Sequence, residues 1–249
     1  MFNRGKIFSA LAAVMLVAAS VCAVAPASAA VAAGSADKKA KNVARVSVPL
    51  NLAVLVQDDL VSRVGNEIDV TREFIRELPA GSRVMVGYLT SGSLQVRQKF
   101  TEDLEQAGRA LRIPAGTETS SPYNPYVEVV EALRHFEADG KNRNVVLLIS
   151  DGLDVSRGFD SFTSINSIDM ERAVREAKRR NVVVYSFYAP AVGLTSSNRQ
   201  AVSFGQGALN RLSNETGGRA FFQGTSFVSF NPYFERLSRT LNNEAGVGF

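Results

Sequence analysis

The chain has 249 residues, of which 45% are hydrophobic and 21% charged, an ordinary globular balance that allows one or two domains. Its formal net charge of +4 is too small to indicate nucleic acid or an anionic membrane as the partner. With one histidine and one cysteine, the sequence offers almost nothing from which to build a Ser-His-Asp, Cys-His or zinc site.

The N-terminus predicts an export signal. Arg4 and Lys6 precede the uncharged apolar stretch Ile7–Ala25, and Ala27-Ser28-Ala29 supplies the small residues of a cleavage site. We expect residues 1–29 to be removed and the mature protein to be periplasmic or extracellular. A retained membrane anchor is the alternative, because the stretch is about long enough to span a bilayer.

Cleavage would leave a balanced chain without cysteine. It removes two basic residues and Cys22, so that 26 basic residues face 24 acidic ones and no disulfide is possible. Residues 30–45 are rich in Ala, Gly, Ser and Lys without periodicity, which predicts a flexible leader. We expect residues 46–243 to form one domain and residues 244–249 a short tail.

From residue 46 onward, predicted strands and helices alternate. The run Leu52–Ser62 (LAVLVQDDLVS) begins as a continuous aliphatic strand, which suits burial on both faces of a parallel sheet. Further strands are predicted at 83–89, 94–100, 144–150, 182–188 and 219–222, and helices at 67–78, 102–111 and 199–216 and from Pro125, Ser167 and Asn231 onward. The run 94–100 alternates apolar and polar residues, as the edge strand of a hairpin does. This order predicts a three-layer, doubly wound α/β fold with a mostly parallel sheet and one antiparallel edge strand.

The helix that starts at Pro125, with Asn124 as its cap, turns an apolar stripe toward the core. The spacing places Glu128, Glu131 and His135 together on the other face. We therefore expect the single histidine to be solvated beside glutamates.

Carboxylates end two of the buried strands. Asp58 and Asp59 follow the first strand, and Asp151 follows the strand 144–150. Because ligands of open α/β sheets lie outside the carboxyl ends of the strands, these acids should share one rim. Neither GxGxxG nor GxxxxGK[ST] occurs, so a nucleotide phosphate is not indicated, whereas oxygen ligands suit a hard cation.

These positions resemble the metal-ion-dependent adhesion site of the von Willebrand factor type A (vWA) family. In Asp58-Asp59-Leu60-Val61-Ser62, the first and last residues match the Asp and second Ser of its Asp-x-Ser-x-Ser motif. Thr117 and the Asp151-Gly152 pair match its other two elements, and the resemblance covers roughly residues 46–241. It implies Mg²⁺ or Mn²⁺ held by Asp58, Ser62, Thr117 and Asp151.

The sequence departs from the family at Leu60, where the motif has a serine that ligates the metal. An aliphatic side chain offers a cation nothing, so the resemblance implies weak or absent metal binding. Two alternatives stay open: a weak Mg²⁺ or Mn²⁺ site, or a vestigial site whose Asp58 and Asp151 only hydrogen-bond the surrounding loops.

Three functions fit such a rim. The first is an exported, non-enzymatic module that binds another protein through the loops 58–65, 115–124 and 153–166. The second is a phospho-acceptor receiver, for which the run 55–59 (LVQDD) is suggestive but the distance from Asp58 to Asp151 is wrong. The third is a metal-dependent hydrolase, for which no nucleophile or general base stands out. The first is the expected function.

Overall fold

The structure is a computed structural model that describes residues 45–90, 92–116, 124–137, 142–158, 167–222 and 229–246. Residues 244–246 are described by their backbone alone. The described residues belong to one compact unit spanning Asn42–Phe249. The predicted signal peptide and all but the last residue of the leader lie outside these ranges. In the ranges given, no helix combines the length and the apolarity needed to cross a membrane.

A single sheet forms the centre of this unit. Its six strands are β1 (Leu50–Gln57), β2 (Arg83–Thr90), β3 (Ser93–Thr101), β4 (Arg143–Ser150), β5 (Val182–Tyr188) and β6 (Ala220–Phe221). They lie in the order β3-β2-β1-β4-β5-β6, and every pairing is parallel except that of β2 with β3. The predicted doubly wound sheet with one antiparallel edge strand is confirmed.

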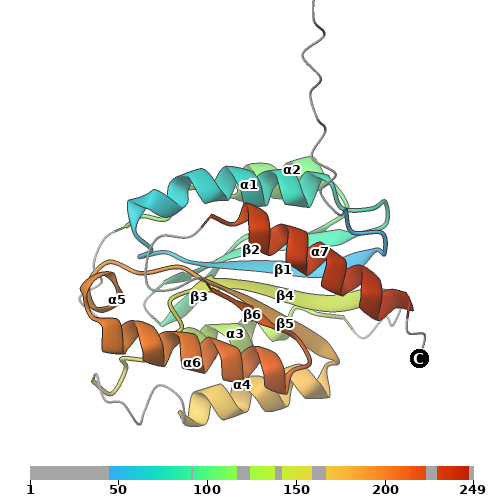
Figure 1. Cartoon of the computed structure of the whole chain (residues 1–249). Helices are drawn as coiled ribbons and strands as arrows, with labels where there is room; N and C mark the ends of the chain where they lie inside the picture. Colours follow the sequence, from blue (N-terminus) through green and yellow to red (C-terminus); the bar gives the residue numbers. More distant parts are fainter. Residues whose placement is uncertain are drawn as a thin grey trace, which may run out of the picture. The chain divides into compact units, whose positions relative to one another are not determined.

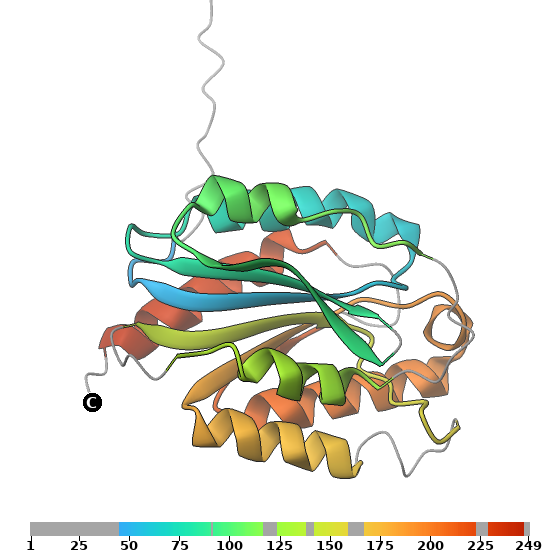
Figure 2. The same cartoon turned by 180° about the vertical axis from the view of Figure 1, so that it is seen from behind.

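Helices cover both faces of the sheet (Figures 1 and 2). One face carries α1 (Gly65–Arg76), α2 (Leu104–Ala110) and α7 (Asn231–Gly246); the other carries α3 (Pro125–Leu133), α4 (Ile168–Arg179) and α6 (Arg199–Glu215). Short helical turns η1 (Ser62–Val64) and α5 (Leu194–Ser197) complete the fold. The last helix continues three residues into the predicted tail.

The predicted helix starts have a local cause. The side chain of Asn124 accepts a hydrogen bond from the Tyr126 amide, and that of Ser167 accepts one from the Met170 amide. Each satisfies an amide that a helix start leaves without an intrahelical partner. In α4, acidic residues in the first turn and basic residues in the last also match the helix dipole.

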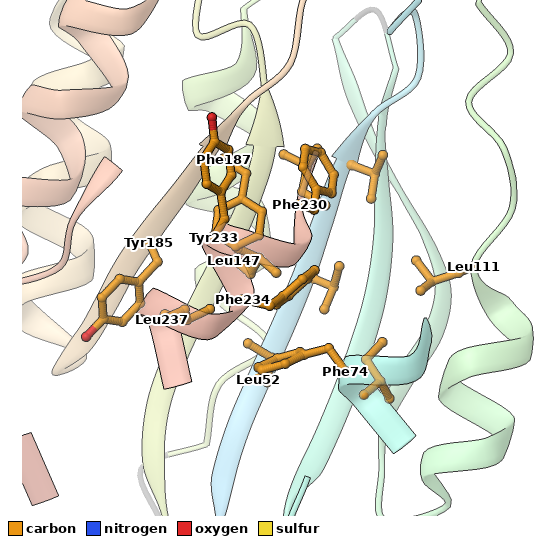
Figure 3. Packing of buried hydrophobic residues seen from close by; sticks show 14 of the residues in the cluster. Leu52, Phe74, Leu111, Leu147, Tyr185, Phe187, Phe230, Tyr233, Phe234 and Leu237 are labelled. Carbon is orange, nitrogen blue, oxygen red and sulfur yellow. The ribbon is translucent and has the colours of Figure 1, made fainter. Parts of the chain in front are cut away.

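An aromatic cluster joins α7 to the sheet (Figure 3). The ring of Phe187 on β5 lies 4.9 Å from that of Phe234 on α7, which stacks at 4.3 Å on Phe74 of α1. Burying such rings removes on the order of 150–250 Å² each from water. This packing fixes α1 and α7 against the same face of the sheet.

We call the edge of the sheet at which the five parallel strands end the carboxyl edge, and the opposite one the amino edge. The carboxyl edge consists of residues 58–64, 111–116, 151–158 and 189–198, Phe222, the β2–β3 turn and the first turns of α3, α4 and α6. Of the predicted metal ligands, Asp58, Ser62 and Asp151 fall on it, whereas Thr117 lies outside the described residues.

Candidate functional site

Asp58 follows β1 and is bound by an arginine that the sequence did not single out. Its two carboxylate oxygens accept hydrogen bonds from Nη1 and Nη2 of Arg112, at 2.6 and 2.7 Å. The Ala115 amide donates to the same carboxylate at 3.0 Å. Planar Arg–carboxylate pairing of this kind adds geometric specificity to the charge interaction.

Arg112 is itself positioned by contacts with the side chain of Tyr88. Its guanidinium carbon lies 4.2 Å from the centre of the Tyr88 ring, and the Tyr88 hydroxyl donates to the Arg112 carbonyl and accepts from its amide. Burial alone would raise the pKa of the Asp58 carboxyl, but the hydrogen bonds from Arg112 and Ala115 and the guanidinium charge hold it below its ordinary value. Asp58 is therefore a charged, paired group.

Asp151 lies deeper and is connected to the rim through Gln57. The Gln57 carbonyl oxygen accepts from the Ser150 hydroxyl and the Asp151 amide, at 2.6 and 2.9 Å, and its amide nitrogen donates to Asp59. The carboxylate of Asp151 accepts from the Leu153 amide and the Thr195 hydroxyl. Burial raises the pKa of Asp151 to about 7, and the nearby Asp59 charge adds to the rise.

Leu60 is a core residue and not a lost ligand position facing solvent. It is fully buried, and its backbone forms an antiparallel bridge with Ala191. The Val61 amide donates to the Pro190 carbonyl, and the Val192 amide donates to the Asp59 carbonyl. The continuations of β1 and β5 thus meet beyond the end of β4, which lies between them in the sheet.

The residues present do not fit a divalent cation in this arrangement. The oxygens of Asp58 and Asp151 accept hydrogen bonds from protein donors, and Arg112 already supplies positive charge. Ser62 is exposed at the start of η1, while Thr117 lies outside the described residues. Within the described ranges, no group of three or more His, Cys, Asp and Glu side chains could hold a metal. Metal binding stays a prediction, and the geometry favours the hydrogen-bonded alternative.

The expected surroundings of His135 are partly wrong. His135 is exposed as predicted, but Glu128 is fully buried against the carboxyl-edge turn between β2 and β3. Neither of its carboxyl oxygens has a hydrogen-bond partner of normal geometry among the described residues. Loss of water raises the pKa of Glu128 to about 9, a rise that the amides of Gly92 and Ser93 only partly oppose. Glu128 is therefore protonated at neutral pH.

Exposed apolar side chains gather on the carboxyl edge. Ile113 is 60% exposed in the loop after α2, and Ile168 is 64% exposed at the start of α4. Across the described residues, the large hydrophobic side chains that are exposed are Ile113, Val127, Ile168, Leu194 and Phe222. All five lie on segments that belong to this edge: Ile113 in the loop after α2, and the other four after the ends of strands or at the starts of helices. No periodicity marks them, because each belongs to a different connection.

No family model and no curated protein matches the chain. Among solved structures, it is similar to the conserved hypothetical protein BatB from Bacteroides thetaiotaomicron, with 10% identity and a TM-score of 0.54 over 79% of this chain and 99% of that one. It is also similar to an aerotolerance-related membrane protein from Bacteroides fragilis NCTC 9343, with 10% identity and a TM-score of 0.51 over 78% of this chain and 99% of the other.

A weaker likeness links the chain to the SpRpn10 VWA domain, with 12% identity and a TM-score of 0.45 over 74% of this chain and 93% of that one. At such identities, likeness concerns the fold. The strand order, together with the two stronger likenesses, confirms the predicted vWA-like fold.

Proposed function

We propose that this vWA-like domain is an exported, non-enzymatic interaction module that binds a partner protein with its carboxyl edge and needs no divalent cation. One observation carries the proposal: the five large apolar side chains that are exposed among the described residues share this edge. Apolar side chains gathered at one place on a surface are typical of protein interaction sites.

The ion pair between Arg112 and Asp58 supports binding without a metal. It connects the loop after β1 to residues 112–115, which a shared cation would otherwise have to do. A partner would therefore meet an edge whose loops are already positioned by protein groups, which lowers the entropic cost of binding.

The placement of titratable groups supports a non-enzymatic role. His135 follows α3 on the amino edge, away from the carboxylates of the carboxyl edge. Asp58 is charged and paired, and Asp151 is hydrogen-bonded and 95% buried, so neither is presented to a substrate as a free base. Export rests on the N-terminal signal, and one structural relative is described as a membrane protein.

Capture of partners from the protein's own envelope fraction tests the proposal. The bait is the exported chain, compared with Ile113→Ser combined with Leu194→Ser, and with Arg134→Ser as a control on the exposed end of α3 at the amino edge. We expect the double variant to lose about tenfold or more in affinity for the captured protein, whereas the control and added chelator leave binding unchanged. Loss of binding in the control alone would overturn the assignment of the carboxyl edge.

A further inference from the structure

The segment that follows β5 forms a short turn in which one side chain is buried and its neighbour is exposed. It leads through α5 into α6, and Figure 1 shows α5 at the end of the sheet where α6 begins. Leu194 is 40% exposed, whereas Thr195, the next residue, is 2% exposed. A buried hydroxyl is costly unless it is hydrogen-bonded, so the partners of Thr195 explain why the turn holds it inside.

The hydroxyl of Thr195 connects the turn to the carboxyl group of Asp151. It donates to Oδ2 of Asp151 at 2.9 Å and accepts from the Ala191 amide at 2.8 Å. The Ala191 carbonyl, at 3.4 Å, is the more distant acceptor for the same hydrogen. Oδ1 of Asp151 accepts from the Leu153 amide at 3.0 Å, so one carboxyl group holds the segments after β4 and β5 together. A hydroxyl both donates and accepts, which is why threonine suits this position.

Backbone contacts fix the residues on both sides of Leu194. The Val192 amide donates to the Asp59 carbonyl at 2.8 Å, and the Asn198 amide donates to the Leu194 carbonyl at 2.8 Å. Gly193 has a φ of 97°, in the left-handed region that favours glycine, and this turns the chain between Val192 and Leu194. The exposed leucine side chain therefore projects from a backbone that is held before any partner binds.

A second exposed aliphatic side chain is presented in the same way. Ile113 lies between Arg112 and Ala115, both of which donate hydrogen bonds to the carboxylate of Asp58. Asp58 and Asp151 are the two carboxylates that the vWA resemblance assigns to a metal. In this structure each of them instead holds a segment whose exposed side chain is apolar.

We propose that Thr195 is a positioning residue, held by Asp151, that places Leu194 against an apolar surface of the partner protein. The inference rests on the proposed function and identifies the residues that place one of its contacts. Because a leucine side chain offers no hydrogen-bonding group, the partner groups that meet it are aliphatic or aromatic. A turn held before binding loses little conformational entropy on association, which strengthens a contact made through Leu194. Asp151 thereby supports binding without a cation.

A double-mutant cycle with a selected peptide tests whether Thr195 acts through Leu194. Random peptides displayed on phage are selected on the exported protein, and those that bind Leu194→Ala more weakly serve as probes in titration calorimetry. We expect Leu194→Ala and Thr195→Val each to weaken such a peptide about fivefold or more, and the double variant to bind no more weakly than Leu194→Ala alone. Thr195→Ser retains the hydroxyl and should retain the affinity.

Hydrogen exchange of the unmodified exported protein, followed by NMR, is a second measurement that does not depend on Thr195→Val folding. The Ala191 amide should exchange about tenfold or more slowly than in an unstructured peptide, because its acceptor is the buried Thr195 hydroxyl. Exchange of this amide at the unstructured rate would overturn the inference.

The cycle separates failure of the inference from failure of the proposed function. Suppose that Leu194→Ala weakens the probes, but that Thr195→Val has no effect or weakens them by the same factor with and without Leu194. Thr195 then does not act through Leu194, and the inference alone fails. If no selected peptide is weakened by Leu194→Ala or Ile113→Ser, the carboxyl edge is not the interaction surface and the proposed function fails as well.

Discussion

At the amino edge of the sheet, Arg45 and Arg83 pair with carboxylates of other elements, whereas at the carboxyl edge the five large apolar side chains that are exposed among the described residues come together. Both edges belong to the same sheet and lie over the same two hydrophobic layers. The difference shows that, among the described residues, the large apolar side chains left for another molecule are confined to one edge. Four predictions test how deep this difference goes.

The largest effects should come from glycines beneath each edge, where the two edges should behave alike. A Cβ at Gly205 would lie 2.0 Å from the Asp151 carbonyl oxygen, and one at Gly218 would lie 2.0 Å from the Val184 carbonyl oxygen. Because backbone must move in both cases, we expect Gly205→Ala and Gly218→Ala each to lower the free energy of unfolding by about 3 kcal/mol in urea titrations.

Gly65→Ala is the matched control for these two variants. A Cβ there meets only Ile113, at an ordinary 3.4 Å, and alanine favours the helix. If Gly205→Ala lowered the free energy of unfolding by less than about 1 kcal/mol, the backbone beneath the carboxyl edge could shift at little cost. The packing beneath the two edges would then differ in rigidity.

The second largest effect should be a pH-dependent contribution to the free energy of unfolding, which Glu128 makes at the carboxyl edge. Glu128 has a folded pKa of about 9, above its ordinary value, so its proton stabilises the fold below the unfolded pKa and this contribution is lost as pH rises toward 9. We expect the free energy of unfolding to fall by a few kcal/mol between about pH 5 and 9. Glu128→Gln should remove most of that slope.

Glu137→Gln at the amino edge controls for the loss of a carboxylate, because its side chain is 68% exposed in a surface pair with Arg83. It should leave the slope in place. Asp151, with a folded pKa of about 7, contributes in the same direction at lower pH. If Glu128→Gln kept the full slope, Glu128 would have to find a charge-stabilising partner in the fold.

Breaking one ion pair at each edge should give a smaller contrast. Arg112→Gln leaves the Asp58 carboxylate, only 16% exposed, without its partner, and should cost about 2 kcal/mol. Arg83→Gln breaks a pair with the exposed Glu137 and should cost less than about 1 kcal/mol. If both variants lost the same free energy of unfolding in urea titrations, the Arg112–Asp58 pair would contribute no more to stability than the surface pair.

The smallest expected effect concerns Mg²⁺ and Mn²⁺. Because both carboxylate oxygens of Asp58 are already paired with Arg112, we expect millimolar concentrations of either ion to leave the melting temperature of the protein unchanged. Leu60→Ser should not create a response, since residue 60 points into the core. A reproducible increase in melting temperature that Asp151→Ala abolishes would instead support the weak metal site implied by the vWA resemblance.

Most of the fold could be read from the sequence because its signals are local. The aliphatic runs predicted β1 and β4, the alternation at 94–100 predicted the antiparallel edge strand, and the caps at Asn124 and Ser167 marked two helix starts. Each of these signals spans a few neighbouring residues, and the alternation of strands and helices predicted the mostly parallel sheet but not the order of its strands.

The candidate site was harder to predict because its contacts join distant residues. Arg112 lies 54 positions from Asp58, and nothing in the residues around it distinguishes it from other exposed arginines. Helical spacing placed Glu128 with Glu131 and His135, but it carries no information about the hairpin turn that covers the first turn of α3. Leu60 looked like a lost ligand, although the bridge to Ala191 makes it a packing residue.

The meeting of the β1 and β5 continuations beyond β4 has a kinetic consequence. The bridge between Leu60 and Ala191 and the hydrogen bond from Thr195 enclose the carboxyl group of Asp151. Because Asp151 is only 5% exposed, we expect a proton to reach that group mainly when the segments 58–61 and 189–195 separate. After a sudden change of pH, Asp151 should therefore equilibrate at the rate of this local opening, while carboxyl groups on the surface respond at the rate of diffusion.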